Sequence, residues 1–173
     1  MNIILFGFKS CGKTTIGKLL AERLGRPFID NDQVIEKQYE EKHGRRLSFR
    51  QICQEEGEEV FYSVLEKEAL LSLAGASDAI ISVGGSAVLE EGKLKILQQL
   101  GTLIYLKIDK ELLKERILSA PLPAFFDAQD PEGSFEKMYQ ERVLRYEQIP
   151  CIAIDVTGKT VEQIALEIEK YGK

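Results

Sequence analysis

The segment from Gly7 to Thr15 constrains this chain more than any other part of its sequence. It reads Gly-Phe-Lys-Ser-Cys-Gly-Lys-Thr-Thr, contains the pattern GxxxxGK[ST], and directly follows the apolar run 2–6. Such a loop between a strand and a helix points backbone N–H groups at phosphate oxygens, and the following helix start adds partial positive charge. We therefore expect a nucleoside triphosphate, in the simplest case ATP. The expected nucleotide-binding residues are Ser10, Cys11, Gly12, Lys13, Thr14 and Thr15.

Two side chains of this phosphate loop, residues 7–15, are expected to act directly. The ammonium group of Lys13 can reach the β- and γ-phosphates, and the hydroxyl group of Thr14 can bind Mg²⁺. Gly7 and Gly12 permit backbone conformations and a close approach of phosphate that a Cβ would obstruct. The motif predicts a triphosphate site, but it does not identify the group that accepts the phosphate.

Length and composition limit the function further. The 173 residues suit one domain over 1–173, and the formal net charge of −5 argues against non-specific nucleic-acid binding. Cys11, Cys53 and Cys151 lack the spacing of a zinc site or a disulfide framework, which predicts reduced thiols. No apolar run approaches the ~20 residues of a membrane span. We expect a cytoplasmic monomer whose partners are small molecules, without a role at nucleic acid or at a membrane.

Short apolar runs alternate with helical periodicity along the chain. Runs rich in Ile, Val and Leu predict five strands, at 2–6, 27–29, 79–83, 102–108 and 151–156. Apolar residues at three- and four-residue intervals predict helices at 13–24, 32–43, 48–56, 58–73, 89–100, 110–119, 135–148 and 161–170. Asp32, Ser48 and Ser134 are suited to helix N-caps. The alternation predicts an α/β fold of three layers, a five-stranded parallel sheet flanked by helices.

The stretch 121–133 is irregular, with three prolines, two phenylalanines and no basic residue. Loops of this length in a small domain often close over a substrate, so we predict a lid at about 118–133. A passive surface loop is the alternative.

Four more segments follow the phosphate loop in order. They are 28–32 (Phe-Ile-Asp-Asn-Asp), 57–61 (Gly-Glu-Glu-Val-Phe), 82–88 (Ser-Val-Gly-Gly-Ser-Ala-Val) and 142–146 (Arg-Val-Leu-Arg-Tyr). With the loop, this series resembles the shikimate kinase family over nearly the whole chain. The resemblance implies a P-loop kinase fold with acceptor-binding helices at about 32–62. It also implies Mg²⁺-assisted transfer of the γ-phosphoryl group of ATP to a hydroxyl of shikimate, yielding ADP and shikimate 3-phosphate for aromatic amino-acid biosynthesis.

Asp30 and Asp32 stand at the carboxyl end of a predicted strand, where open α/β sheets bind ligands in a crevice. By resemblance, Asp30 steadies the Mg²⁺ shell together with Thr14. The resemblance assigns Asp32 to the acceptor hydroxyl, whose deprotonation it would assist as a catalytic residue beside Lys13. The alternative is that Asp32 only caps the next helix, and both roles are compatible.

The remaining assignments also come from the resemblance. Gly84 and Gly85 match backbone that contacts the acceptor, although a glycine pair can also be a simple turn. Arg142 matches the arginine that grips the substrate carboxylate, for which a guanidinium fork is well suited. Arg116 and Lys159 resemble positions that flank adenine, with exposed surface charge as the alternative.

Two positions depart from the family's pattern, and both remove positive charge. Tyr62 follows Phe61 where the family has an arginine on the substrate carboxylate; a phenol can still contact the substrate, but without charge. Ala120 precedes Pro-Leu where the family's lid carries an arginine, a kind of residue that stabilises the transition state of phosphoryl transfer. The arginines that could supply this charge from elsewhere are Arg45, Arg46, Arg50 and Arg145.

Three functions are therefore open. The first is phosphorylation of shikimate. The second is a related kinase for another polyol or hydroxy acid, which the uncharged Tyr62 would tolerate. The third is a nucleotide-binding protein that has lost phosphoryl transfer, which the loss of the lid arginine at Ala120 would explain.

Overall fold

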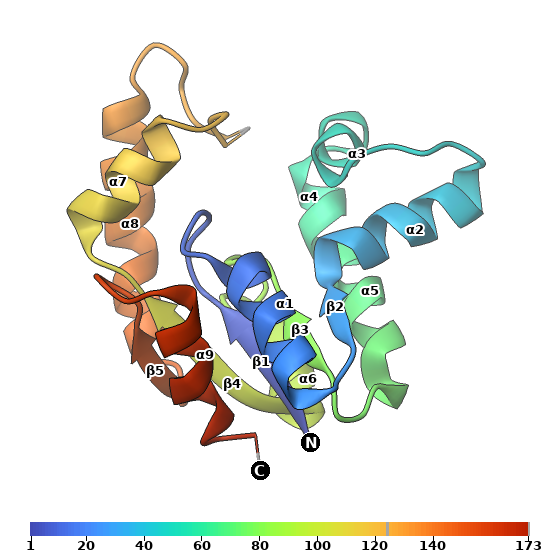
Figure 1. The fold of residues 1–173 in the computed structure, drawn as a ribbon. Coiled ribbons are helices and arrows are strands. Elements are labelled where there is room, and N and C mark those ends of the chain that lie inside the picture. Colours follow the sequence, from blue (N-terminus) through green and yellow to red (C-terminus); the bar gives the residue numbers. More distant parts are fainter. Residues whose placement is uncertain (124, 173) are drawn as a thin grey trace.

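The computed structural model of the protein describes residues 1–123 and 125–172. The strands form one parallel sheet in the order β2-β3-β1-β4-β5, with β1 at its centre (Figure 1). The strands are β1 (Asn2–Phe6), β2 (Phe28–Asp30), β3 (Ile80–Ser82), β4 (Gly101–Lys107) and β5 (Ile152–Asp155). The predicted five-stranded parallel sheet is confirmed.

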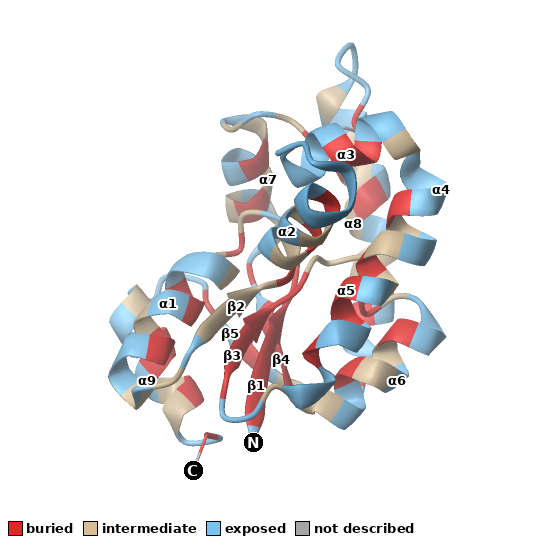
Figure 2. Ribbon diagram, turned by 90° about the vertical axis from the view of Figure 1, so that its right-hand side faces the viewer, coloured by how far each residue is buried: buried red, intermediate tan, exposed pale blue. Residues whose placement is uncertain are grey.

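Helices cover both faces of this sheet. The described helices are α1 (Lys13–Leu24), α2 (Asn31–His43), α3 (Phe49–Glu56), α4 (Glu58–Val60), α5 (Glu66–Ser72), α6 (Glu91–Leu100), α7 (Lys110–Leu118), α8 (Pro131–Glu147) and α9 (Val161–Glu169). Helices α1 and α9 lie together on one face, and α5 and α6 lie on the other (Figure 2). The predicted three layers are confirmed. None of the described helices is long and apolar enough to cross a membrane.

The central strand explains why the chain begins with an unbroken apolar run. Ile4, Leu5 and Phe6 have no exposed surface, because helices cover β1 from both sides (Figure 2). A parallel strand buried on both faces is apolar at every position and does not alternate with polar residues. The phosphate loop therefore leaves the sheet from its most deeply packed strand.

Two predicted N-caps are wrong, and one is confirmed. Helix α2 is capped by Asp30, whose carboxylate accepts a hydrogen bond from the backbone N–H of Asp32 at 3.1 Å. Helix α8 begins at Pro131 and is capped by Asp130, four residues before Ser134, because proline is well suited to a first helical turn. Ser48 caps α3 in a capping box, as predicted.

The predicted helix 58–73 is interrupted. A π-helical turn (Phe61–Leu65) joins α4 to α5, and a 3₁₀ turn (Leu73–Gly75) follows α5. Single π turns inside helices occur often at functional sites. Tyr62, one of the two departures from the family's pattern, lies in this turn.

The predicted lid is shorter at its carboxyl end than expected. Helix α7 ends at Leu118 and α8 begins at Pro131, which leaves 119–130 as the connection. Ala124 of the predicted lid and Lys173 of the predicted domain lie outside the described residues. Closure of this segment over a substrate stays a prediction.

The predicted acceptor-binding helices pack around a small apolar cluster separate from the main core. Its buried residues are Ile35, Tyr39, Ile52, Cys53, Phe61 and Ala69, which come from α2, α3, the π turn and α5. The segment 32–62 therefore has its own packing centre beside the sheet.

Candidate active site

The phosphate loop connects β1 to α1 and depends on its glycines for two reasons. Gly7 and Gly12 have φ angles of 148° and 101°, a region that side chains disfavour. A Cβ on Gly7 would also lie 2.9 Å from the carbonyl oxygen of Leu106 in β4. Packing against the neighbouring strand therefore requires glycine at residue 7, in addition to the expected approach of a phosphate.

The start of α1 is suited to an anion. Its N-cap is Gly12, and no described side chain caps it, whereas Asp30, Ser48 and Thr160 cap α2, α3 and α9. The N–H groups of the first helical turn, beginning at Lys13, therefore keep their hydrogen-bonding capacity. Together with the helix dipole, they favour binding of a phosphate group.

The side chain of Lys13 packs against the backbone of the phosphate loop. Its Nζ donates to the carbonyl oxygens of Gly7 at 3.1 Å and of Phe8 at 2.8 Å. Arg116 also reaches the loop, with Nη1 3.4 Å from the carbonyl oxygen of Ser10. Both cations predicted to bind nucleotide here are therefore next to the loop's backbone.

Thr14, in the first turn of α1, lies close to Asp30 at the carboxyl end of β2. The Thr14 hydroxyl lies 3.3 Å from Oδ2 of Asp30. No group of three or more acidic, His or Cys side chains suited to a metal ion occurs in residues 1–123 and 125–172. A hydroxyl and one carboxylate fit Mg²⁺, which in kinases is bound by few protein ligands together with phosphate oxygens and waters.

Asp32 has the electrostatics of a general base. Burial of the carboxyl group, and secondly the nearby Asp30 carboxylate, raise the pKa of Asp32 to about 7, while the ammonium group of Lys13 opposes this rise. A base whose pKa lies near neutral pH combines an available ionised form with strong proton affinity. Asp32 is also close enough to Lys13 for the two charges to interact.

The glycine pair Gly84 and Gly85, called the glycine turn below, contacts the phosphate loop through Gly85. Its carbonyl accepts a hydrogen bond from the Tyr146 hydroxyl at 2.9 Å. A Cβ on Gly85 would lie 2.3 Å from that hydroxyl oxygen and 2.9 Å from the carbonyl oxygen of Gly7. Only glycine fits this contact, which a simple exposed turn would not require.

Tyr62 and Arg142, both predicted to bind the acceptor, interact electrostatically. Burial raises the pKa of Tyr62 to about 12, and the positive charge of Arg142 partly offsets this rise. The guanidinium carbon of Arg142 also lies 5.2 Å from the ring centre of Phe125 in the predicted lid. Arg142 therefore connects the π turn with the lid.

Comparison with known proteins agrees with this geometry. The family model for shikimate kinase matches residues 9–171. A shikimate kinase of Caldanaerobacter subterraneus subsp. tengcongensis is 33% identical over 96% of this chain and 93% of its own length. A shikimate kinase of Bacillus anthracis is 36% identical over 98% of this chain and 96% of its own length. The chain belongs to the shikimate kinase family.

This member of the shikimate kinase family is an ATP-dependent kinase, and its fold is similar to that of solved relatives. The shikimate kinase of Acinetobacter baumannii, solved in complex with shikimate, aligns with a TM-score of 0.83 and 28% identity. The alignment covers 98% of this chain and 91% of that one.

Two of the arginines that could replace the positive charge missing at residues 62 and 120 have other partners in the structure. Arg45 is engaged by Glu55, with Nη2 2.7 Å from Oε2. Arg145 donates to the carbonyl oxygen of Leu89. Neither is aimed at the phosphate loop, so these two of the four arginines considered from the sequence are committed elsewhere.

Sequence reasoning missed a buried ion pair behind the acceptor residues. Nζ of Lys93 lies 2.5 Å from Oε2 of Glu66 and donates to the carbonyl oxygen of Tyr62 at 3.0 Å. The Ser86 hydroxyl, next to the glycine pair, lies 3.3 Å from Oε1 of Glu66. One sequence pattern could have revealed the pair, because Lys93 stands one helical turn before the buried Leu97 on the same face of α6.

Lys159 is the predicted nucleotide-binding residue with the least structural support. Its Nζ lies 2.7 Å from Oε2 of Glu167 in α9. Its place beside adenine stays a prediction.

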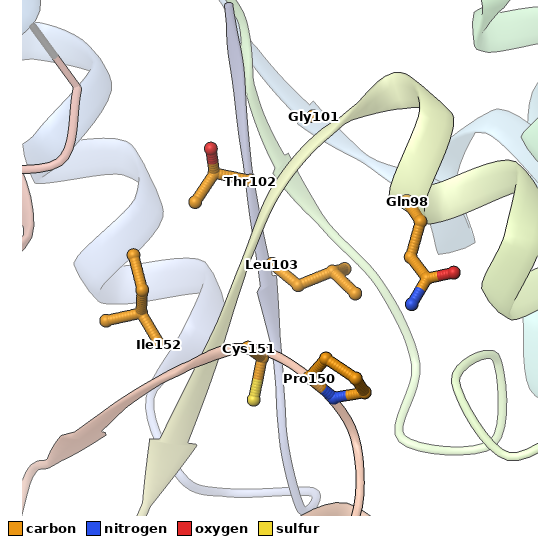
Figure 3. A pocket seen from close by; sticks show the side chains of 7 residues that line it. All are labelled: Gln98, Gly101, Thr102, Leu103, Pro150, Cys151 and Ile152. Atoms are coloured by element: carbon orange, nitrogen blue, oxygen red, sulfur yellow. The ribbon is translucent and has the colours of Figure 1, made fainter.

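A hollow lies at the opposite end of the sheet from the phosphate loop (Figure 3). It measures about 270 Å³ and is lined by Gln98, Gly101, Thr102, Leu103, Pro150, Cys151 and Ile152. Gly101 begins β4, whereas the phosphate loop follows the end of β1. Because ligands of open α/β sheets bind at the carboxyl ends of the strands, we do not assign the active site to this hollow.

Proposed function

We propose that this enzyme transfers the γ-phosphoryl group of ATP to a hydroxyl of shikimate, giving ADP and shikimate 3-phosphate. The observation that carries the proposal is Asp32, a partly buried carboxyl group whose pKa is raised to about 7 beside Lys13 and the phosphate loop. A base at this place is suited to a hydroxyl acceptor next to a nucleotide.

In the proposed reaction, Asp32 holds the acceptor hydroxyl and takes its proton. The hydroxyl oxygen bonds to the γ-phosphorus, and the bond from that phosphorus to the β,γ-bridging oxygen breaks, leaving ADP. Lys13 and the first turn of α1 neutralise the negative charge that develops on the phosphates. Positioning and electrostatics of this kind supply most of the catalysis in phosphoryl transfer.

Thr14 and Asp30 are proposed to hold Mg²⁺, which would neutralise charge on the phosphate oxygens. Their separation of 3.3 Å supports a shared ligand, and Asp30 is fixed by its role as N-cap of α2. The remaining ligands would come from the nucleotide and from water.

The acceptor is proposed to lie among Tyr62, Gly84, Gly85 and Arg142. Arg142 would bind its carboxylate by a charge-assisted pair of hydrogen bonds, and backbone of the glycine turn would contact its hydroxyls. Action as a monomer in the cytoplasm stays a prediction.

The test combines purified protein with ATP, Mg²⁺ and millimolar shikimate and measures shikimate 3-phosphate directly. We expect turnover, and Asp32→Asn should nearly abolish it while ADP binding persists. Absence of product from the wild-type protein would refute the proposal.

A second candidate, phosphorylation of another hydroxy acid or a polyol, is favoured by Tyr62 alone. The phenol stays neutral, because burial holds its pKa near 12, so residue 62 offers no charge to a carboxylate. Tyr62→Arg separates the candidates. It should lower the KM for shikimate if shikimate is the acceptor and leave it unchanged otherwise.

A further inference from the structure

Tyr146, in the last turn of α8, hydrogen-bonds to the glycine turn from inside the core. Its side chain has no exposed surface, and its hydroxyl donates to the carbonyl oxygen of Gly85 at 2.9 Å. Burial raises the pKa of this hydroxyl to about 12, and the positive charge of Arg142 partly offsets the rise. The hydroxyl is therefore protonated at neutral pH and can act as the donor that fixes the turn.

The ring of Tyr146 contacts the phosphate loop independently of this hydrogen bond. Its centre lies 4.9 Å from that of Phe8, the second residue of the loop, and the ring planes meet at 69°. Phe8 also stacks on Tyr139, with ring centres 5.3 Å apart and planes inclined by 14°. Aromatic pairs favour such edge-to-face and stacked arrangements. Two tyrosines of α8 therefore fix the position of this helix relative to the phosphate loop.

Arg142 shares one face of α8 with these two tyrosines. Tyr139, Arg142 and Tyr146 follow one another at intervals of three and four residues, which places them on the same side of the helix. The ring contacts with Phe8 thus locate Arg142 relative to the phosphate loop, whereas the hydroxyl of Tyr146 locates Gly85. One change, removal of this hydroxyl, can separate the two effects.

We propose that Tyr146 is a positioning residue, whose hydroxyl holds the glycine turn where the acceptor binds it. The side chain itself touches no substrate, because it is buried and acts through Gly85. The inference rests on the proposed function, in which backbone of the glycine turn contacts the hydroxyls of the acceptor. It assigns part of the acceptor affinity to a hydroxyl that lies behind the binding surface.

Steady-state kinetics with Tyr146→Phe tests the proposal. The variant keeps the ring and its contact with Phe8 but leaves the carbonyl of Gly85 without its donor. The KM for shikimate should rise about three- to tenfold, the effect of losing one hydrogen bond. The kcat should change little, because the turn would contact the acceptor equally before and during phosphoryl transfer. The KM for ATP and the calorimetric affinity for ADP should stay within about twofold of the wild type.

Tyr105→Phe is the matched control. Tyr105 is 3% exposed, belongs to β4, and has its ring centre 5.3 Å from that of Tyr146. This variant removes a hydroxyl from the same aromatic cluster and leaves the hydrogen bond between Tyr146 and Gly85 in place. Its KM values for shikimate and ATP should equal those of the wild type. A purely structural effect would lower the melting temperature without changing the KM for shikimate.

Three results would overturn the inference while leaving the proposed function intact, since in each the wild type phosphorylates shikimate. In the first, Tyr146→Phe keeps the wild-type KM for shikimate. In the second, the KM values for shikimate and ATP rise equally, which would show no selective effect on the acceptor. In the third, kcat falls at unchanged KM, which would assign the hydroxyl to the transfer step. A wild type that forms no shikimate 3-phosphate would refute the proposed function itself, and this inference with it.

Discussion

Lys93 and Glu66 form an ion pair with almost no contact with solvent. Their side chains are 3% and 2% exposed, and the pair spans α6 and α5. Through the carbonyl of Tyr62 and the hydroxyl of Ser86, it also connects the π turn to the glycine turn. Two segments proposed to contact the acceptor are thus fixed by one buried charge pair.

Removal of one partner should be costly. Lys93→Met should lower the free energy of unfolding by about 3–5 kcal/mol, because Glu66 is left in a buried site without its cation. Burial already raises the pKa of Glu66. A folded pKa above the unfolded one favours the folded state at low pH, so the variant should regain stability as the pH falls. Urea unfolding at several pH values measures both effects.

A double variant separates charge from packing. Glu66→Leu combined with Lys93→Met should recover most of the lost stability, since a buried ion pair can often be replaced by apolar side chains. The control is Lys95→Met, whose pair with Glu91 has side chains 66% and 81% exposed. It should leave the free energy of unfolding almost unchanged, because exposed ion pairs contribute little to stability. Equal losses from Lys93→Met and Lys95→Met would contradict the assignment.

Gly85→Ala should damage nucleotide binding as well as stability. The new methyl group would collide with the Tyr146 hydroxyl and with the Gly7 carbonyl, so the glycine turn or the phosphate loop must move. We expect a weaker affinity for ADP, measured by calorimetry, and a lower melting temperature. Gly75→Ala is the control, because a Cβ there has no neighbour within 4 Å. Unchanged ADP affinity in Gly85→Ala would show that the turn and the loop are not coupled.

The fold could be predicted from the sequence because its main signals are local. The buried run 2–6 and the glycine motif after it are contiguous, and α1 begins and ends where predicted. The cap of α2 was less certain, because Asp30 and Asp32 are both good N-cap residues. Which of the two caps α2 depends on where β2 ends, and sequence periodicity locates that end only within a few residues.

The candidate site was predictable only where a motif spans it. Lys13 and Thr14 belong to one motif, whereas Lys93 and Glu66 are 27 residues apart and meet only through packing of α5 against α6. The contact of Lys9 could not be predicted for another reason, because a lysine inside a phosphate-binding motif suggests a nucleotide contact. Its hydrogen bond to the carbonyl oxygen of Pro121 depends on the tertiary structure, which the spacing of residues in the motif does not determine.

Asp32 should titrate near neutral pH in the metal-free protein. Its folded pKa of about 7 lies above the unfolded value of about 3.9. Its contribution to stability is therefore complete below about pH 4 and is lost as the pH rises through 7. Catalysis needs the ionised form, so kcat/KM should fall as the pH drops below this range. Carboxyl ¹³C NMR measures the pKa directly.

Asp30→Asn isolates one cause of this shift. Asparagine can still cap α2, but it removes the negative charge that helps to raise the pKa of Asp32. The pKa of Asp32 should therefore fall below that of the wild type, while the melting temperature changes little. An unchanged or higher pKa would show that the Asp30 carboxylate does not help to raise the pKa of Asp32.

The contact between Arg142 and Phe125 should compete with acceptor binding. Cation–π contacts at exposed sites are worth about 0.5–1 kcal/mol, and Phe125 is 43% exposed. Phe125→Ala should therefore release Arg142 and tighten shikimate binding about two- to fivefold, as measured by calorimetry. Phe125→Tyr keeps the aromatic ring and should bind shikimate like the wild type. Weaker binding by Phe125→Ala would mean instead that the ring contacts the acceptor, and that Arg142 is positioned by Phe125 in the bound state.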